Sequence, residues 1–552
     1  MRYFAALGLA FALLTAAANA QVKTISAVDL QQARSSSDWL MYGHDYSNDR
    51  YAALDQINTS NVAGLVPAFV FQTAVAQPFE TTPVVVDGKM YVTTAYDHVF
   101  AIDAKSGKRL WQYQPKLGTT IFCCGPVNRG VAIAGGLVYL GQLDGKLVAL
   151  DQATGKIKWS VQAGDNAGGY SLTMAPLIYK NMVLVGGAGG EYGIRGSLSA
   201  FAQTDGKLVW RWYSTDAQHW AGKFTPTTAD GADLHRDISA EKAAYPKYAD
   251  AWKRGGGEVW MTPAVDPAMN TIFVSTGNPS PDLYGAIRPG DNLYTDSMVA
   301  IDASNGKLKW YYQEVPHDVW DLDAVSPPVL IDAVDGSGKS VEAVAQAGKT
   351  GWLYIVDRRT GKLIRKSQNF VPQESMFAQP TTKGTRMLPG ANGGAEWSPT
   401  SYDPKLHYVF VSALHQPMLY YTKPQELQPG ALWLGSAFVG IPTEQQYGLI
   451  SAIDVNSGAV AWQDKVDYPL LGGTVSTSGG LTFVGEGNGN FDAIDSKTGR
   501  ILWQFQTGAG VNAAPMVYQI DGEEYVAVAS GGSFQIGTAY GDSLYIFHLP
   551  KH

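Results

Sequence analysis

Cysteine and charge are both scarce in this chain. It contains only two cysteines, the neighbours Cys123 and Cys124, and no Cys-x-x-Cys-His occurs. That motif attaches c-type haem covalently, so such a haem is excluded. Charged residues make up 16% of the chain, its net charge is −8, and Lys and Arg do not gather into basic runs. Nucleic acid and anionic membrane surfaces are therefore not expected partners.

Long hydrophobic runs are also lacking. One apolar stretch, from Tyr3 to Leu14, follows Met-Arg and leads into small residues that end at Ala20. It is shorter than the roughly 20 residues that a membrane-spanning helix needs. The pattern is typical of a cleavable secretory signal over residues 1–20. We therefore expect a periplasmic protein without a membrane span, whose mature part begins at Gln21.

Glycine and aromatic residues are abundant instead, and one segment recurs. The chain has 61 glycines and is 11% aromatic, which indicates a turn-rich β protein. Each repeat has an apolar pair, an Asp, a turn that reaches Gly four residues later, and a Trp eight residues after the Asp. The full copies end at Trp111, Trp159, Trp310, Trp462 and Trp503. Two degenerate copies have Ala202 in place of the Asp, before Trp210, and Arg365 in place of the Trp.

Each copy predicts a β-hairpin that cannot bury its own Trp. The ring must then pack on the neighbouring unit, so the units are expected to dock side by side. Seven units are present, and the apolar strands of residues 513–547 form an eighth if residues 68–73 complete their sheet. The sequence thus predicts an all-β, eight-bladed β-propeller with tryptophan-docking repeats, in one domain over residues 21–552. A seven-bladed ring is the alternative.

Beyond the repeats, two motifs carry a family resemblance. The segment DWLMYGHDYSNDRYAALDQINTSNVAGL spans residues 38–65, and CCGPVNRG spans residues 123–130. Together they resemble the quinoprotein alcohol dehydrogenases that use pyrroloquinoline quinone (PQQ), over nearly the whole mature chain. The repeats alone are weakly specific, whereas CCGPVNRG followed by a Glu, an Asn and WDxD is strongly specific. The resemblance implies an alcohol substrate and a soluble cytochrome c or similar electron acceptor, and it is compatible with a homodimer.

The adjacent cysteines are an unusual pair. Consecutive Cα atoms lie about 3.8 Å apart, below the usual range of about 4.4–6.8 Å for a disulfide. A bond between Cys123 and Cys124 would therefore close a small, strained ring. In the resembling family this ring lies flat against one face of the quinone. Two free, buried thiols are the alternative.

A set of oxygen ligands follows in order along the chain. Glu191 lies in GGAGGEYGIRG, Asn278 in STGNPSP, and Asp321 and Asp323 in PHDVWDLDAVSPP. Carboxylate and amide oxygens suit Ca²⁺ or a similar large cation, not zinc or copper. Taken singly, each also has a structural explanation, such as a surface acid or a turn former. By resemblance, the first three contact the metal, and Asp323 is similar to the extra carboxylate of lanthanide-using members. An equivalent Asp occurs in the membrane glucose dehydrogenase branch, so both calcium and a lanthanide stay open.

The resemblance also implies a set of residues around the quinone. Arg and hydroxyl donors suit the three acid groups of this cofactor. The set comprises Glu80, Cys123, Cys124, Arg129, Thr173, the backbone of Ala188, Gly189 and Gly190, Trp260 against the opposite ring face, and Lys349 at the reactive carbonyl oxygens. Three positions depart from the family pattern. Leu471 replaces a Trp and could widen the mouth of the site, Leu414 replaces an Asn, and Glu258 replaces a Thr.

The implied reaction assigns two catalytic residues. Asp321 is expected to remove the hydroxyl proton of the alcohol as a general base, and Lys349 to stabilise charge on the carbonyl oxygen. Small primary alcohols are the default substrate. Bulky secondary alcohols and, as an alternative function, aldoses stay open. A rival reading is a non-enzymatic propeller that scaffolds the cell envelope, which would have no use for the paired cysteines together with the oxygen ligands.

Overall fold

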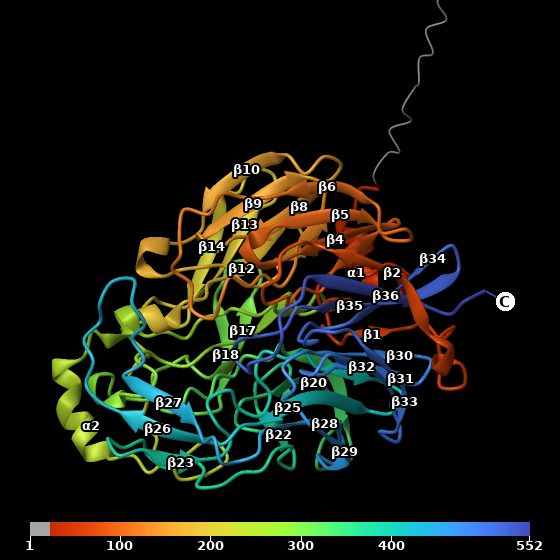
Figure 1. Ribbon diagram of the computed structural model, residues 1–552. Coiled ribbons are helices and arrows are strands. Elements are labelled where there is room, and N and C mark those ends of the chain that lie inside the picture. The colour runs from red at the N-terminus through yellow and green to blue at the C-terminus, as the bar shows by residue number, and fades with distance from the viewer. Residues whose placement is uncertain (1–22, 552) are drawn as a thin grey trace, which may run out of the picture.

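The computed structural model describes residues 23–551, and the predicted leader over residues 1–20 lies outside them. The regular structure of the described chain is almost entirely β-strand, joined by loops and turns. It forms seven four-stranded sheets, one five-stranded sheet and one three-stranded sheet. The sheets follow one another around the molecule in chain order (Figure 1). Contacts between the first strands of neighbouring sheets bring those strands together at the centre.

The first four sheets are simple antiparallel meanders. The first sheet contains β3 (Val84–Val86), β4 (Lys89–Thr93), β5 (Val99–Asp103) and β6 (Arg109–Tyr113), and the second contains β7 (Ala132–Ala134), β8 (Leu137–Gly141), β9 (Lys146–Asp151) and β10 (Ile157–Gln162). The third contains β11 (Leu177–Tyr179), β12 (Met182–Gly186), β13 (Ser197–Ala202) and β14 (Leu208–Tyr213), and the fourth contains β15 (Ala264–Asp266), β16 (Thr271–Ser275), β17 (Ser297–Asp302) and β18 (Leu308–Gln313). The first strand of each sheet is fully buried, whereas every last strand has exposed residues, and β10 alternates between exposed and half-buried ones. This burial pattern places the first strands inside and the last strands outside.

The remaining sheets include the closing one. The fifth sheet contains β19 (Val329–Val334), β20 (Ser340–Ala347), β21 (Leu353–Asp357) and β22 (Leu363–Lys366), and the sixth contains β24 (Ser401–Asp403), β25 (Tyr408–His415), β28 (Tyr447–Asp454) and β29 (Val460–Val466). The five-stranded sheet contains β1 (Tyr51–Ala52), β30 (Thr474–Thr477), β31 (Leu481–Gly485), β32 (Asn490–Asp495) and β33 (Ile501–Gln506). The closing sheet contains β2 (Val66–Gln72), β34 (Met516–Ile520), β35 (Glu523–Ser530) and β36 (Ser543–His548). A three-stranded sheet of β23 (Thr385–Met387), β26 (Met418–Thr422) and β27 (Ser436–Gly440) stands apart from them. The α-helices are α1 (Ala27–Gln31) and α2 (Ile238–Ala244).

Both ends of the chain meet in one sheet. Strand β2 pairs antiparallel with β36, so that Val66 faces His548 and Gln72 faces Ser543. The short β1 pairs in parallel with β30 of the preceding sheet. The early part of the chain therefore bridges two sheets formed by the last hundred or so residues, and the sheet edge of β36 is covered.

Each repeated tryptophan lies on the outermost strand of its sheet and reaches the next sheet. The indole Nε1 of Trp111 donates to the carbonyl of Gln152 at 3.0 Å, and that of Trp159 to the carbonyl of Gln203 at 3.0 Å. The same bond joins Trp210, Trp310, Trp462 and Trp503 to Ala303, Arg358, Ser496 and Leu65. A Cβ at Gly155 would lie 2.5 Å from the Trp111 ring, so this turn position needs glycine both for the close approach and for its φ of +70°.

Between the strands of the sheets run long connections. The segment between β14 and β15 carries α2, and the segment after β22 carries β23. Within residues 23–551, no helix is long and apolar enough to cross a bilayer.

The buried imidazole of His44 gives the fold an acid sensitivity. His44 is 2% exposed, its Nδ1 has no hydrogen-bond partner, and burial together with the charges of Arg34 and Arg50 lowers its pKa to about 3. Below pH 6.5 the unfolded chain takes up a proton at this residue and the folded chain does not. The free energy of unfolding should thus fall by about 1.4 kcal/mol per pH unit from pH 6.5 towards pH 3 on account of this group.

The variant His44→Asn isolates that contribution, because Asn tolerates the φ of 77° at this position. Between pH 6.5 and pH 5, wild type should lose about 2 kcal/mol more stability than the variant, as measured by urea unfolding. Identical pH dependence of the two proteins would mean that His44 is not buried as a neutral ring.

Candidate active site

A cavity of about 480 Å³ gathers most of the predicted site residues. Its lining comes from the loops that connect strands within and between successive sheets. The predicted residues on its wall are Cys123, Cys124, Arg129, Thr173, Ala188, Gly189, Glu191, Trp260, Asp321, Asp323 and Lys349. Glu80, Gly190 and Asn278 lie directly behind this wall, because each contacts a residue that lines it or stands next to one. Segments far apart in sequence are thus brought to one place.

Lys349 stands at the centre of a group of carboxylates. Its side chain is 4% exposed, and its Nζ lies 2.6 Å from Asp323 Oδ2, 3.3 Å from Asp321 Oδ1 and 3.6 Å from Glu396 Oε1. Burial alone would lower the pKa of Lys349, but the carboxylates outweigh it and hold that pKa well above its usual value. Burial raises the pKa of Asp321 well above its usual range despite the nearby ammonium group. Asp321 can therefore hold a proton at the cavity wall.

The turn that carries Asp321 is fixed from behind. Asp318 accepts backbone hydrogen bonds from Trp320 at 3.1 Å and from Leu322 at 3.1 Å. These bonds bracket Asp321, which has a φ of 62°. The carbonyl of Asp318 in turn accepts a hydrogen bond from the buried guanidinium of Arg288. The position of the carboxylate is thus set by buried groups outside the cavity.

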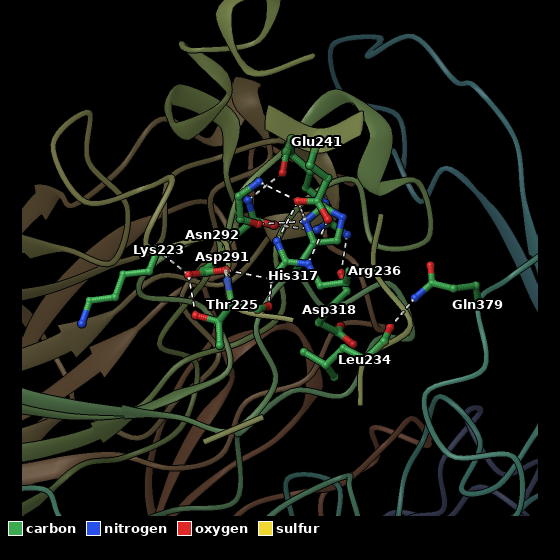
Figure 2. Close-up of polar contacts among 12 residues, drawn as sticks. Lys223, Thr225, Leu234, Arg236, Glu241, Asp291, Asn292, His317, Asp318 and Gln379 are labelled. Carbon is green, nitrogen blue, oxygen red and sulfur yellow. Dashed lines mark hydrogen bonds and ion pairs between the residues drawn. The ribbon is translucent and has the colours of Figure 1, made fainter. Parts of the chain in front are cut away.

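A buried polar cluster supports the same turn and ties the α2 segment to it (Figure 2). Arg236 lies 2.7 Å from Glu241 and 2.8 Å from Asp291. Asp291 also accepts from the backbone of Lys223 at 2.7 Å, and its own carbonyl accepts from the backbone of His317, next to Asp318. The segment between β14 and β15 is therefore anchored under the site rather than free on the surface.

Three further carboxylates lie beside this group. Glu191, Glu258 and Asp282 line the cavity, and each has a buried oxygen without a hydrogen-bond partner. Burial, and then repulsion by Glu191 and Asp323, raises the pKa of both Glu258 and Asp282 well above the usual range. Burial likewise raises the pKa of Glu191. Buried acids with free oxygens are costly without a cation, so this donor set fits a hard metal ion.

Arg129 lies between two indole rings on another wall. Its guanidinium carbon is 5.0 Å from the centroid of Trp260 and 4.8 Å from that of Trp397. Its Nη2 is 2.7 Å from Glu80 Oε2, and both side chains are almost completely buried. Burial raises the pKa of Glu80 to about 7, with Arg129 opposing the shift. The Nε atom of Arg129 has no protein partner, which leaves a donor for an acidic ligand.

The two cysteines lie at the cavity wall with their Sγ atoms 2.7 Å apart. The structure has them as free thiols, so the disulfide between them stays a prediction. Their sulfur atoms and the carboxylate of Glu191 lie within 4.8 Å of one another. The two sulfur atoms therefore lie next to Glu191, one of the residues predicted to bind the metal.

One expectation about the mouth of the site is wrong. Leu471 does not line the cavity; it is fully buried in a small apolar cluster with Leu414 and Trp397. Because it lies inside this cluster, Leu471 forms no part of the cavity wall. Sequence reasoning also missed Asp282 and Glu396 altogether, and it treated Glu258 only as a departure from a pattern. Their one local signal is an acid in a Gly- or Pro-rich loop, which is too common to be specific.

The chain is similar to known proteins over most of its length. Residues 39–376 and 435–526 match the family described as PQQ: glucose/ethanol/alcohol dehydrogenase, beta-propeller domain. The quinoprotein alcohol dehydrogenase PedH of Pseudomonas putida is 36% identical over 543 residues, which covers 94% of this chain and 90% of that protein. The quinohemoprotein alcohol dehydrogenase of Comamonas testosteroni is 36% identical over 92% of this chain and 74% of its own length. A solved europium-containing methanol dehydrogenase superposes with a TM-score of 0.83 at 31% identity, covering 95% of this chain and all of that one.

Proposed function

We propose a mechanism from one premise: the chain belongs to the family of PQQ dehydrogenases that act on glucose, ethanol and other alcohols, and it oxidises an alcohol with that quinone. The observation that carries the mechanism is the meeting of Asp321, Lys349 and the further acids in one cavity. When bound, the quinone supplies the acceptor for two electrons and the carbon-bound hydrogen of the alcohol. The protein supplies position, charge and a proton acceptor.

The fold is a β-propeller, and we assign its eight larger sheets as the blades. The indole hydrogen bonds that leave six of the outer strands for the next sheet support tryptophan docking between them. The sheet of β2 and β34–β36 is then the closing blade. The three-stranded sheet of β23, β26 and β27 is an insertion beside the cavity.

The quinone is held between the Cys123–Cys124 pair and Trp260 in this proposal. Arg129 and Thr173 bind its acid groups, because a guanidinium with a free Nε and a hydroxyl are the donors that carboxylates require. Glu80 fixes Arg129 through their buried ion pair. The backbone of residues 188–190 would border the quinone, since Ala188 and Gly189 line the cavity and Gly190 stands next to them.

The cation, Ca²⁺ or a lanthanide, is held by Glu191, Asn278, Asp321 and Asp323. Glu191 has a free buried oxygen, and all four residues offer oxygen atoms, the donors that a hard cation prefers. When bound, the ion supplies Lewis-acid polarisation. The backbone N–H of Asn278 donates to Asp323 Oδ1 at 2.9 Å, which holds the two ligands together.

Proton transfer is assigned to Asp321. One of its Oδ atoms accepts the hydroxyl proton of the alcohol as the oxidation proceeds. The Nζ of Lys349 stands 3.3 Å from Asp321 Oδ1, from where the ammonium group stabilises negative charge that develops on an oxygen in the cavity. The product is the aldehyde or ketone.

The substrate is proposed to be an alcohol with a hydrophobic group. One side of the cavity is lined by apolar side chains, several of them from β26, β27 and the segment between: Phe122, Met418, Leu432, Leu434, Phe438 and Phe534. Burying a polyhydroxylated sugar against this wall would leave its hydroxyl groups without partners, at a cost of about 1–3 kcal/mol for each one. The wall therefore favours primary or bulky secondary alcohols over aldoses.

Steady-state kinetics test the function. Protein reconstituted with PQQ and either Ca²⁺ or a light lanthanide should reduce an artificial dye in the presence of 1-butanol or 2-phenylethanol, with a kcat/KM at least about tenfold above that for glucose. Leu432→Ser should raise the KM for the apolar alcohol, whereas Leu208→Ser, an exposed position on β14, should not. The proposal would be contradicted if glucose were the only substrate that reduced the dye. It would also be contradicted if neither alcohol reduced the dye with either ion.

The net charge of the protein and its predicted export indicate the electron acceptor and the compartment. Electrons pass to a soluble cytochrome c or similar carrier, and the net charge of −8 suits a basic one. Export to the periplasm, directed by residues 1–20, places the enzyme where such carriers act.

A further inference from the structure

The carboxylates of the cavity outnumber its cations. Six acids line it: Glu191, Glu258, Asp282, Asp321, Asp323 and Glu396. Lys349 and Arg129 are the basic residues on the same wall. Lys349 forms ion pairs with Asp321, Asp323 and Glu396, whereas Arg129 pairs with Glu80 behind the wall. Within residues 23–551, Glu191, Glu258 and Asp282 have no Lys or Arg within ion-pair distance, and the other three acids share the single positive charge of Lys349.

Glu258 is built into the expected ion site rather than next to it. It is 2% exposed, and its Oε1 accepts the backbone N–H of Gly190, the neighbour of Glu191, at 3.0 Å. Its Oε2 has no partner. A Cβ on Gly277 would lie 2.6 Å from Asp323 Oδ1 and 3.1 Å from Glu258 Oε2, so the two carboxylates approach the same point of the chain. Only glycine at 277 permits this approach.

Asp282 lines the same cavity. It is 1% exposed and lines the cavity with an unpartnered Oδ1. Its backbone is fixed, because its carbonyl accepts from Arg288 at 3.0 Å and the N–H of the following Leu283 donates to Leu434 at 2.7 Å. Asp282 follows Asn278 in one short loop, so both can face one ion.

We propose that Glu258 and Asp282 are additional ligands of the cation and that, with Glu191, they select a trivalent ion over a divalent one. The attraction between an ion and a carboxylate is proportional to the ion's charge, so each added carboxylate favours the trivalent ion. The acids of the cavity carry more negative charge than Lys349 can balance, and a trivalent ion offsets more of that excess than a divalent one. Carboxylate oxygens are also the donors that a large, hard cation takes in high number. This inference rests on the proposed function for the location of the ion.

Direct ion binding tests the assignment without turnover. Metal-free protein is titrated with Eu³⁺ and with Ca²⁺ by calorimetry, and the waters on bound Eu³⁺ are counted from its luminescence lifetimes in H₂O and D₂O. Wild type should bind Eu³⁺ at least a hundredfold more tightly than Ca²⁺. Glu258→Gln and Asp282→Asn should each weaken Eu³⁺ binding at least tenfold, weaken Ca²⁺ binding less, and add water to the bound ion.

Glu314→Gln is the matched control, because Glu314 is 1% exposed and has two unpartnered oxygens but does not line the cavity. It should leave Eu³⁺ affinity and hydration unchanged. Glu258→Asp keeps the negative charge but moves the carboxylate oxygens away from the ion, because its side chain is one carbon shorter. It should therefore also add water to the bound Eu³⁺. Unchanged affinity and hydration in Glu258→Gln and Asp282→Asn, with binding lost in Glu191→Gln, would overturn this inference and leave the proposed function standing. Retention of binding in Glu191→Gln as well would contradict both.

Discussion

Replacing Asp321 by Asn should lower kcat by about a hundredfold to ten-thousandfold, the range contributed by a positioned general base. The amide keeps the shape of the side chain and loses the proton acceptor. The turn should survive, since Asp318 and Arg288 hold it from outside the cavity. Dye-coupled turnover of the PQQ-loaded variant, with near-normal thermal melting, is the measurement.

Ion loss must be separated from loss of the base, because Asp321 is also a proposed ligand. Glu191→Gln provides the comparison: it weakens ion binding, and saturating ion should restore part of its kcat. The kcat of Asp321→Asn should stay lowered by about a hundredfold or more at every ion concentration. Asp464→Asn, on the outer strand β29, should behave like wild type. Turnover by Asp321→Asn at saturating ion would remove this residue from the base role.

Arg129→Met should weaken PQQ binding by about 2–5 kcal/mol, which is about thirtyfold to several thousandfold. The substitution removes the donor for an acid group of the ligand and the cation between Trp260 and Trp397. It also leaves Glu80 buried without its partner. Equilibrium titration of the metal-loaded apoprotein with PQQ measures the affinity.

A double variant separates the loss of the quinone's hydrogen-bond donor from the cost of leaving Glu80 buried without a partner. Glu80→Gln combined with Arg129→Met should recover thermal stability, since the unpaired buried carboxylate is gone. It should not recover PQQ affinity. An affinity of Arg129→Met within threefold of wild type would mean that the guanidinium does not face the quinone.

The strands were predictable because their pattern is local. The Asp–turn–Gly–Trp repeat marks hairpins such as β5–β6 and β9–β10, whose strands end close to where the repeat ends. The segment expected at 68–73 to complete a late sheet corresponds to β2 (Val66–Gln72), which pairs with β36. The sheet of β23, β26 and β27 was not foreseen, since its strands carry no repeat and pair across long connections.

The site was predictable only where short motifs marked it. CCGPVNRG and WDLD led to cysteines, Arg129 and acids that do share the cavity. Asp282 and Glu396 were missed because what makes them unusual is burial next to other acids, a property of the assembled loops. Leu471 was misjudged for the same reason, since only packing against Leu414 and Trp397 shows that it faces away from the mouth.

The pairing of β2 with β36 also governs when the enzyme can become active. Val66 cannot meet its partner until His548 has been synthesised, and the cavity loops are held in place by sheets that this pairing locks together. A nascent chain therefore has no finished pocket. Quinone and cation must be acquired after synthesis ends, by the completed polypeptide, and a truncation that removes the final strand should abolish loading even though every residue that touches the ligands is still present.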